Sequence, residues 1–204
     1  MFFGVLQRAL TLPRPPRIVG GVMTRTSHRA SDLIRVIQRF VAVDAVGPSA
    51  MRGQGRGVLP AVQEHLGDLD LRGVPKTQRG FGRWLDRQTE TTLSALKGIA
   101  PGRPWGTARK AVNLFLRGCL YNHYLRETYS LGRMEPWLEI PLDGVVARAL
   151  KRLGGRGALP VWRGLKHLTP EESARFQDFV AKRAQAVGLP ARVFLDHDLW
   201  LSNR

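Results

Sequence analysis

The sequence predicts an all-α protein, and three observations carry this prediction. Apolar residues recur at helical spacing in several segments. Residues that favour the beginnings and ends of helices bound these segments, most completely in "LTPEESARFQDFVAKRAQAVGLP" (168–190). No segment alternates apolar and polar residues for long enough to predict a strand, and the run at 193–195 is too short. With 204 residues, 43% of them hydrophobic, we expect one compact domain over 26–204.

The first predicted helix, "SDLIRVIQRFVAVD" (31–44), follows a Ser-Asp start signal. Its spacing predicts one buried face, made of Leu33, Ile34, Ile37, Phe40 and Val41. A basic, glycine-rich loop over 47–57 follows, and then a short helix over 59–66. Residues 67–82 should be irregular, because glycine and proline interrupt any period there.

The middle of the chain predicts two helices around a breaker. One spans 83–96 and stops at "KGIAPGRPWG" (97–106), where glycine and proline forbid its continuation. A long helix then begins near Thr107. We expect its buried face to be Ala108, Ala111, Val112, Phe115 and Cys119. A second stripe, predicted to be basic and polar, consists of Arg109, Asn113, Arg117 and Tyr121.

Three more helices are predicted toward the C-terminus. Asp143 is placed to cap a helix that ends at Gly154. The next helix has a full set of boundary signals: Thr169 as N-cap, Pro170 in the first turn, Glu172 in a capping box and Gly188 at the end. A short last helix is expected from Asp196.

The charge indicates a polyanionic partner. The formal net charge is +16, and 26 of the 32 basic residues are arginine. Arginine contacts phosphate through a planar fork, so we expect nucleic acid, although a GC-rich coding sequence would give the same arginine bias. A ribosome-type or membrane-surface protein is the alternative. No apolar run approaches the roughly 18 residues that span a bilayer, so we expect no membrane partner.

Cysteine and histidine usage predicts no cofactor and no metal. Cys119 is the only cysteine, which excludes an intrachain disulfide, and the five histidines lack ligand spacing. A reducing compartment fits, so we expect a cytoplasmic, nucleoid-associated monomer. Residues 1–25 are basic without an acidic residue. They are interpreted as a leader, which allows organellar targeting, or as a mis-assigned start with Met23 as the first residue, and are excluded from the fold prediction.

A helix, a glycine-bearing hairpin and a second helix over about 83–118 form a layout in which backbone N–H groups can bind DNA phosphate. The second helix carries the pattern Gly106, Arg109, Lys110, Asn113 and Leu116. Taken alone, this pattern also fits a solvated basic helix start. It resembles the helix-hairpin-helix DNA glycosylase superfamily, in which this helix typically reads Gly-x-Gly-Arg-Lys-x-x-Asn-x-x-Leu. The chain departs from that motif at Ala108, where the second glycine would stand.

The resemblance implies two helical lobes flanking a DNA-binding cleft, with Gly106, Arg109 and Asn113 at the DNA. In bifunctional members the motif lysine is the nucleophile, which maps to Lys110. A later motif supplies an essential aspartate, and "IPLDGVVARALKRLG" places Asp143 at its position.

The long interval between Lys110 and Asp143, together with "LEIPLD" and "LDHDLWL", is similar to the archaeal type of 8-oxoguanine DNA glycosylase. In that group a C-terminal Asp and a Trp four residues later line the pocket for the damaged base. They map to Asp196 and Trp200, for which a helix cap and a core residue are the alternative interpretations. Arg117 could reach phosphate or base, or be a solvated arginine. The resemblance covers about residues 83–204.

Base excision requires a flipped nucleotide and a group that stabilises positive charge on the sugar. Asp143 can supply that carboxylate. Lys110 can attack only as a neutral amine, which the helix N-terminus, Arg109 and partial burial favour. The resemblance therefore implies a glycosylase with AP-lyase activity that forms a lysine Schiff base and excises an oxidised purine, such as 8-oxoguanine, from double-stranded DNA, and these residues fit that chemistry.

Three alternatives stay open at this point. One is a helical nucleic-acid-binding protein without catalysis. Another is a glycosylase for a different base, such as uracil or an alkylated purine. The third is a Mg²⁺-dependent nuclease that uses Glu139, Asp143, Asp196 and Asp198.

Overall fold

The computed structural model describes residues 30–99, 102 and 104–201, and within these ranges it is all-α, as predicted. The predicted leader over 1–25 lies outside the described residues. The α-helices are α1 (Ala30–Ala45), α2 (Val58–Gly67), α3 (Gln78–Ala95), α4 (Trp105–Tyr121), α5 (His123–Thr128), α6 (Gly144–Gly154), α7 (Pro170–Ala186) and α8 (Leu195–Leu201). Short 3-10 helices are η1 (Leu71–Gly73), η2 (Leu131–Trp137), η3 (Leu165–His167) and η4 (Arg192–Phe194).

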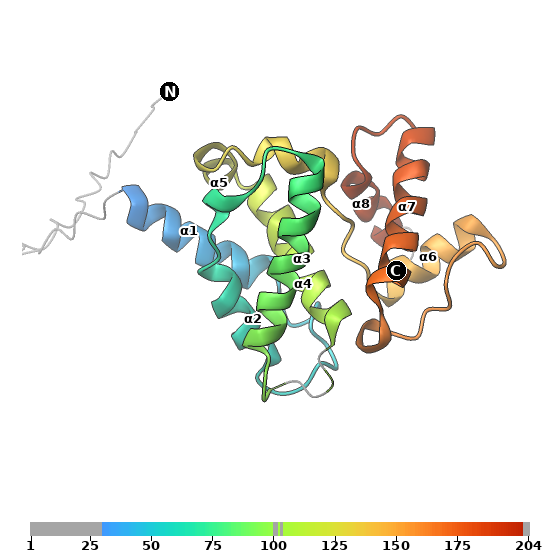
Figure 1. Cartoon of the computed structure of the whole chain (residues 1–204), viewed down its shortest axis with the longest axis horizontal. Helices are drawn as coiled ribbons and strands as arrows, with labels where there is room; N and C mark the ends of the chain where they lie inside the picture. Colours follow the sequence, from blue (N-terminus) through green and yellow to red (C-terminus); the bar gives the residue numbers. More distant parts are fainter. Residues whose placement is uncertain (1–29, 100–101, 103, 202–204) are drawn as a thin grey trace, which may run out of the picture.

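The helices form two groups that lie side by side (Figure 1), and each group encloses a hydrophobic core. Helices α1 to α5 surround the larger core, in which Phe81 and Phe115 are fully buried. Helices α6, α7 and α8 enclose the smaller one around Phe176. The chain crosses from the first core to the second in the extended segment 138–143, and η4 returns Val193 to the larger core. The two cores thus belong to parts of the molecule that meet beside α4.

Helix α4 is more deeply buried than its sequence suggests. Its predicted apolar face is buried as expected, but Arg109 and Asn113 of the predicted polar stripe are also buried. The stripe is basic and polar as predicted, but these two of its residues lie in the interior. The reason is that α1, α3 and η3 all contact α4, so that neighbouring elements cover its polar positions as well.

In helix α1 the buried face also differs from the predicted one. Leu33 and Phe40 are 52% and 70% exposed, which contradicts their assignment to the core. Gln38 is buried instead, and its Nε2 donates to the carbonyl oxygens of Gly67 and Leu69 at 3.1 and 2.7 Å. A buried glutamine is favourable here because it satisfies carbonyl groups at the end of α2 that have no partner within that helix.

Helix α3 begins at Gln78, inside the stretch predicted to be irregular. Thr77 caps it, with its Oγ1 accepting from the Gly80 N–H at 3.2 Å. A Cβ on Gly80 would lie only 2.9 Å from Pro75 Cβ, so the glycine permits a close turn before the helix. Helix α4 likewise begins two residues before the predicted Thr107, at Trp105.

The C-terminal helices follow their boundary signals. Asp143 caps α6, and Thr169 and Glu172 form both hydrogen bonds of the predicted capping box of α7. Gly154 is the last residue of α6, and Gly155 after it takes a positive φ of 75°. Helix α8 begins one residue before the predicted Asp196.

Candidate active site

A pocket of about 540 Å³ opens where the two parts of the molecule meet. Four segments line it: residues 44–52 at the end of α1 and in the following loop, residues 110–117 of α4, residues 141–145 at the start of α6, and α8. The pocket is partly open to solvent. Its size lies within the range of about 300–1,000 Å³ that is typical of ligand sites.

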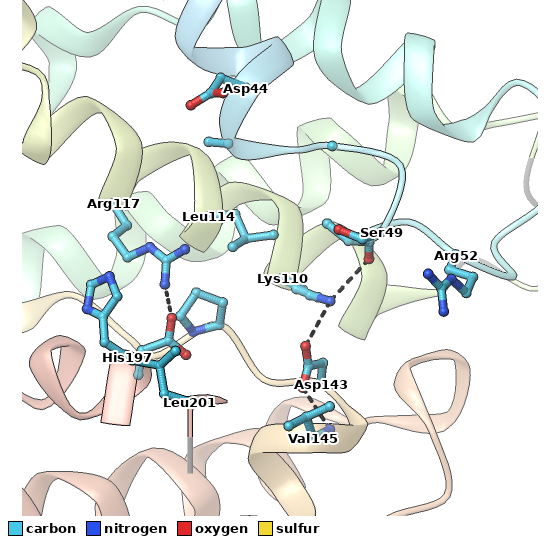
Figure 2. A pocket seen from close by; sticks show the side chains of 15 residues that line it. Asp44, Ser49, Arg52, Lys110, Leu114, Arg117, Asp143, Val145, His197 and Leu201 are labelled. Atoms are coloured by element: carbon cyan, nitrogen blue, oxygen red, sulfur yellow. Dashed lines mark hydrogen bonds and ion pairs between the residues drawn. The ribbon is translucent and has the colours of Figure 1, made fainter. Parts of the chain in front are cut away.

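Lys110 lies in this pocket with only 7% of the residue exposed. Its Nζ donates to the carbonyl oxygen of Ala50 at 3.1 Å and lies 3.3 Å from Oδ2 of Asp143 (Figure 2). The first contact comes from the loop after α1 and the second from the N-terminus of α6. The fold therefore brings together the two residues that the sequence predicts as catalytic, 33 positions apart in the chain.

The two carboxylate oxygens of Asp143 have separate partners. Oδ1 accepts from the N–H groups of Val145 and Val146, both at 2.9 Å, and so caps α6. Oδ2 faces Lys110. Because the cap fixes the side-chain torsions, the second oxygen is held at the pocket without a further partner having to orient it.

Helix α7 holds the segment that leads to Asp143. Gln177 is buried, and it binds the backbone of Ile140 twice: its Oε1 accepts from the Ile140 N–H at 3.1 Å, and its Nε2 donates to the Ile140 oxygen at 2.9 Å. This pair of bonds is the one that a neighbouring strand would supply. It fixes the extended backbone three residues before Asp143.

Arg117 and Asp196 form an ion pair in the wall of the pocket. Burial lowers the pKa of the Arg117 guanidinium, and the nearby Tyr121 partly opposes that shift. Both residues were predicted to bind substrate, and the structure brings them to the same pocket as Lys110. Trp200, the third predicted member, lies in α8, but its side chain is outside the described part of the structure.

Arg109 lies behind the pocket rather than on an open surface. Its guanidinium makes two hydrogen bonds with the Glu139 carboxylate, both at 2.8 Å, and one with Asp86 Oδ1 at 2.9 Å. It also stacks over the Trp105 ring at 5.4 Å from the centroid. These contacts tie α3 and α4 to the segment before α6. They do not support the predicted DNA contact by this side chain.

The pKa of the Glu139 carboxyl lies below its ordinary value, although burial alone would raise it. The hydrogen bonds and charge of Arg109 outweigh that effect, with further contributions from the charge of Arg192 and a bond from Asn113. The pKa of Arg109 is correspondingly raised, because its two carboxylates outweigh the effect of burial.

Asn113 and Gly106 are also interior residues. Asn113 Nδ2 donates to Glu139 at 3.1 Å, and the side chain is almost fully buried. A Cβ on Gly106 would collide with the carbonyl oxygen of Leu165 and lie 2.8 Å from Leu168 Cβ. The glycine therefore lets η3 and its flanks approach the first turn of α4. The structure gives both residues packing roles and places neither at an exposed DNA-facing position.

Four further pocket residues with polar side chains were not predicted. They are Asp44, Ser49, Arg52 and His197. His197 also stacks on Tyr121, with ring centroids 5.9 Å apart. Asp44 is the last residue of the first predicted helix, and Ser49 and Arg52 lie in the basic, glycine-rich loop that follows, so no sequence pattern identifies these side chains as facing a pocket.

The carboxylates considered for a Mg²⁺ site do not gather in one place. Glu139, Asp143 and Asp196 are each paired with a different cation, namely Arg109, Lys110 and Arg117. Among the described residues, no group of three His, Cys, Asp or Glu side chains is arranged to hold a metal ion. None of the helices in the described ranges combines the length and apolar character needed to cross a membrane. Comparisons with protein-family models, with curated proteins and with solved structures gave no match.

Proposed function

We propose that this chain is a DNA glycosylase with AP-lyase activity that removes an oxidised purine, such as 8-oxoguanine, from double-stranded DNA. One observation carries the proposal: the amine of a buried lysine lies 3.3 Å from the aspartate that caps α6, at a pocket partly open to solvent. The formal net charge of +16 supports a polyanionic substrate.

The position of Lys110 suits a nucleophile. Only 7% of the residue is exposed, yet its Nζ lies at the pocket beside Oδ2 of Asp143, where a bound substrate can reach it. In the proposed reaction the amine attacks in its neutral form.

In the proposed reaction Lys110 first displaces the base and then holds the sugar as a Schiff base while the strand is cut. Its neutral Nζ adds to C1′ of a flipped nucleotide as the glycosidic C1′–N bond breaks and the bonding electrons leave with the base. Opening of the sugar ring then gives a Schiff base between Nζ and C1′. Loss of a proton from C2′ allows the bond from C3′ to its phosphate oxygen to break, which cuts the strand by β-elimination.

Asp143 would act through electrostatics. Positive charge develops on the sugar as the glycosidic bond breaks, and Oδ2 lies where it can face that charge. Because Oδ1 is committed to the α6 cap, the carboxylate has little freedom to turn away. Asp143 thus keeps a negative charge beside the reacting centre and also orients the amine.

The position of the pocket between the two cores supports a DNA-binding cleft flanked by two helical lobes. A duplex lying across that junction would present one nucleotide to the pocket, as base-flipping enzymes require. We infer that one copy of the chain is sufficient, because all the residues proposed for the chemistry come from it.

A comparison of base release and strand cleavage tests the proposal. Duplexes would carry one 8-oxoguanine, uracil, alkylated purine or abasic site, beside an undamaged duplex. We expect release of 8-oxoguanine followed by cleavage. Release of uracil or an alkylated purine alone would assign the enzyme to that base instead. Binding of the duplexes with no base released and no strand cut would favour the non-catalytic binding protein.

A further inference from the structure

The charged groups that line the pocket divide into pairs and single residues. Lys110 pairs with Asp143, and Arg117 pairs with Asp196. Neither Arg52 nor Asp44 has an ion-pair partner in the described part of the structure, although both line the pocket. Within each pair the two charges offset one another, so the cation of Arg52 and the carboxylate of Asp44 remain to contact a ligand.

These two residues lie toward opposite ends of the pocket. The end of α1 contacts α4 near Arg117, because a Cβ on Gly118 would lie 3.0 Å from Ala45 Cβ. The chain then runs back along α4, with the carbonyl of Ala50 at Lys110 and Oε1 of Gln54 accepting from Thr107 Oγ1 at 2.6 Å. Asp44 therefore lies toward Arg117, and Arg52 lies beyond Lys110.

The lining residues of α4 set the order between these ends. Lys110, Leu114 and Arg117 lie on one face of the helix and span about 10 Å, since each residue rises about 1.5 Å. Figure 2 shows Arg52 and Arg117 on opposite sides of Lys110. Along the pocket a ligand would meet Arg52, the lysine amine, the apolar side chain of Leu114 and then the Asp44 carboxylate beside the Arg117–Asp196 ion pair.

A nucleotide has the same order of chemistry. Its phosphate is anionic, its sugar carries the carbon that the amine attacks, and its base has an apolar face and N–H groups at its edge. We propose that Arg52 binds a phosphate that flanks the flipped nucleotide and that Asp44 accepts a hydrogen bond from an N–H of its base. This inference rests on the proposed function for the identity of the ligand and assigns its orientation.

The charge on Asp44 gives this inference a second support. Asp44 lies in the last turn of α1, where the helix dipole disfavours a negative charge. It is exposed, and no hydrogen bond or ion pair of its carboxylate is found in the described structure that would offset this effect. In a chain with twice as many basic as acidic residues, a carboxylate in that position weakens general attraction to DNA. Recognition of a hydrogen-bond donor would account for it.

Binding to uncleavable DNA tests the base end. One duplex would carry a 2′-fluoro 8-oxoguanine nucleotide, and a second would carry a tetrahydrofuran abasic site. For Asp44→Asn we expect affinity for the first duplex to fall several-fold, because an amide oxygen accepts a weaker hydrogen bond than a carboxylate, with no loss on the second. Glu64→Gln is the matched control, because it removes an exposed carboxylate outside the pocket.

The sign of the change makes this test decisive. If Asp44 contributes only its charge, Asp44→Asn should strengthen binding to both duplexes, as Glu64→Gln should. Equal behaviour of the two variants would overturn the assignment of Asp44.

Neutral phosphates test the other end. A methylphosphonate would replace the phosphate on the 5′ or the 3′ side of the abasic analogue. We expect one replacement to weaken wild-type binding several-fold and to have no further effect in Arg52→Gln. Arg56→Gln, an exposed loop arginine outside the pocket, should stay sensitive to the replacement. Equal sensitivity in Arg52→Gln and wild type at both positions would overturn the assignment of Arg52.

These binding experiments require no turnover. If the Asp44 and Arg52 variants change binding as expected but the protein cuts no DNA, the pocket orients a nucleotide without lysine catalysis. If the protein cuts DNA but neither variant changes binding as expected, the proposed enzyme stands and this orientation of the nucleotide is wrong.

Discussion

Arg109 and Lys110 are consecutive residues of α4, and each is directed at a carboxylate in the segment that joins the two parts of the molecule. Arg109 binds Glu139 with two hydrogen bonds, and Lys110 lies beside Asp143. The remaining hydrogen bonds of the first pair go to other protein side chains: Arg109 also binds Asp86 and Thr89, and Glu139 also accepts from Asn113. The second faces a pocket. We infer that the Arg109 pair fixes the segment so that the Lys110 pair can take part in chemistry.

Asp143→Asn should slow excision without unfolding the protein. Asparagine caps helices as well as aspartate does, so the α6 cap survives while the charge is lost. We expect the single-turnover excision rate to fall by about 10²–10³-fold, as when one electrostatic contact to a transition state is removed. Asp143→Ala is the comparison, because it should also lose about 1 kcal/mol of stability with the cap. A full excision rate in Asp143→Asn would remove Asp143 from the mechanism.

Glu139→Gln should destabilise the fold at neutral pH. The substitution leaves the buried Arg109 guanidinium without its main carboxylate partner. Breaking one side of such a pair reduces the free energy of unfolding by about 3–5 kcal/mol. Urea denaturation followed by circular dichroism measures this loss. A change below about 1 kcal/mol, the range of surface ion pairs, would show that the pair does not hold the segment.

The contribution of Glu139 should depend on pH in a defined direction. Its pKa is lowered in the folded protein, so the stabilisation is fully present above the unfolded-state value of 4.5. It is lost as the pH falls through the lower folded-state pKa. The difference in unfolding free energy between wild type and Glu139→Gln should therefore shrink in acid. A difference that stays constant from neutral pH to about pH 3 would contradict this assignment.

Gly106→Ala should disturb the contact between the two parts of the molecule. The added Cβ would meet the Leu165 carbonyl, so η3 has to move away from α4. Overpacking of this kind reduces stability by about 1–3 kcal/mol, which thermal unfolding can measure. Gly82→Ala is the matched helical control, since its Cβ would meet no atom within 4 Å. That variant should be neutral or more stable, and a similar loss in both would mean that loss of glycine, rather than the Leu165 contact, determines the effect.

Local signals predicted the elements that depend on local chemistry. The caps of α6 and α7 follow from Asp143, Thr169 and Glu172, whose partners lie within three residues. The α3 start was missed because its cap, Thr77, precedes two glycines that were interpreted as breakers. Periodicity likewise identified the apolar face of α4 but not the burial of Arg109, because the carboxylate that makes this burial favourable lies 30 residues away.

In the candidate site, too, a sequence motif identified some residues, whereas only the folded structure reveals the others. The motif order predicted Lys110 and Asp143 as a pair, and the fold brings them into contact. Asp44 reaches the pocket from the last turn of α1, and Arg52 reaches it from the following loop, whose course along α4 is set by the Ala50 and Gln54 contacts. Those contacts exist only in the folded chain. The contact between Lys110 and Asp143 was therefore accessible to sequence reasoning, whereas the residues that we propose to orient the nucleotide were not.

Trapping of the Schiff base tests the central claim most directly. The protein would be incubated with borohydride and a duplex that carries one 8-oxoguanine, beside uracil-containing, abasic and undamaged duplexes. The account predicts a covalent adduct on the 8-oxoguanine duplex that maps to Lys110 and is absent in Lys110→Gln, which should still bind the DNA. An adduct on the abasic duplex alone would support the AP-lyase activity and contradict the assignment of 8-oxoguanine as the excised base. No adduct on any duplex, with DNA binding intact, would contradict lysine catalysis.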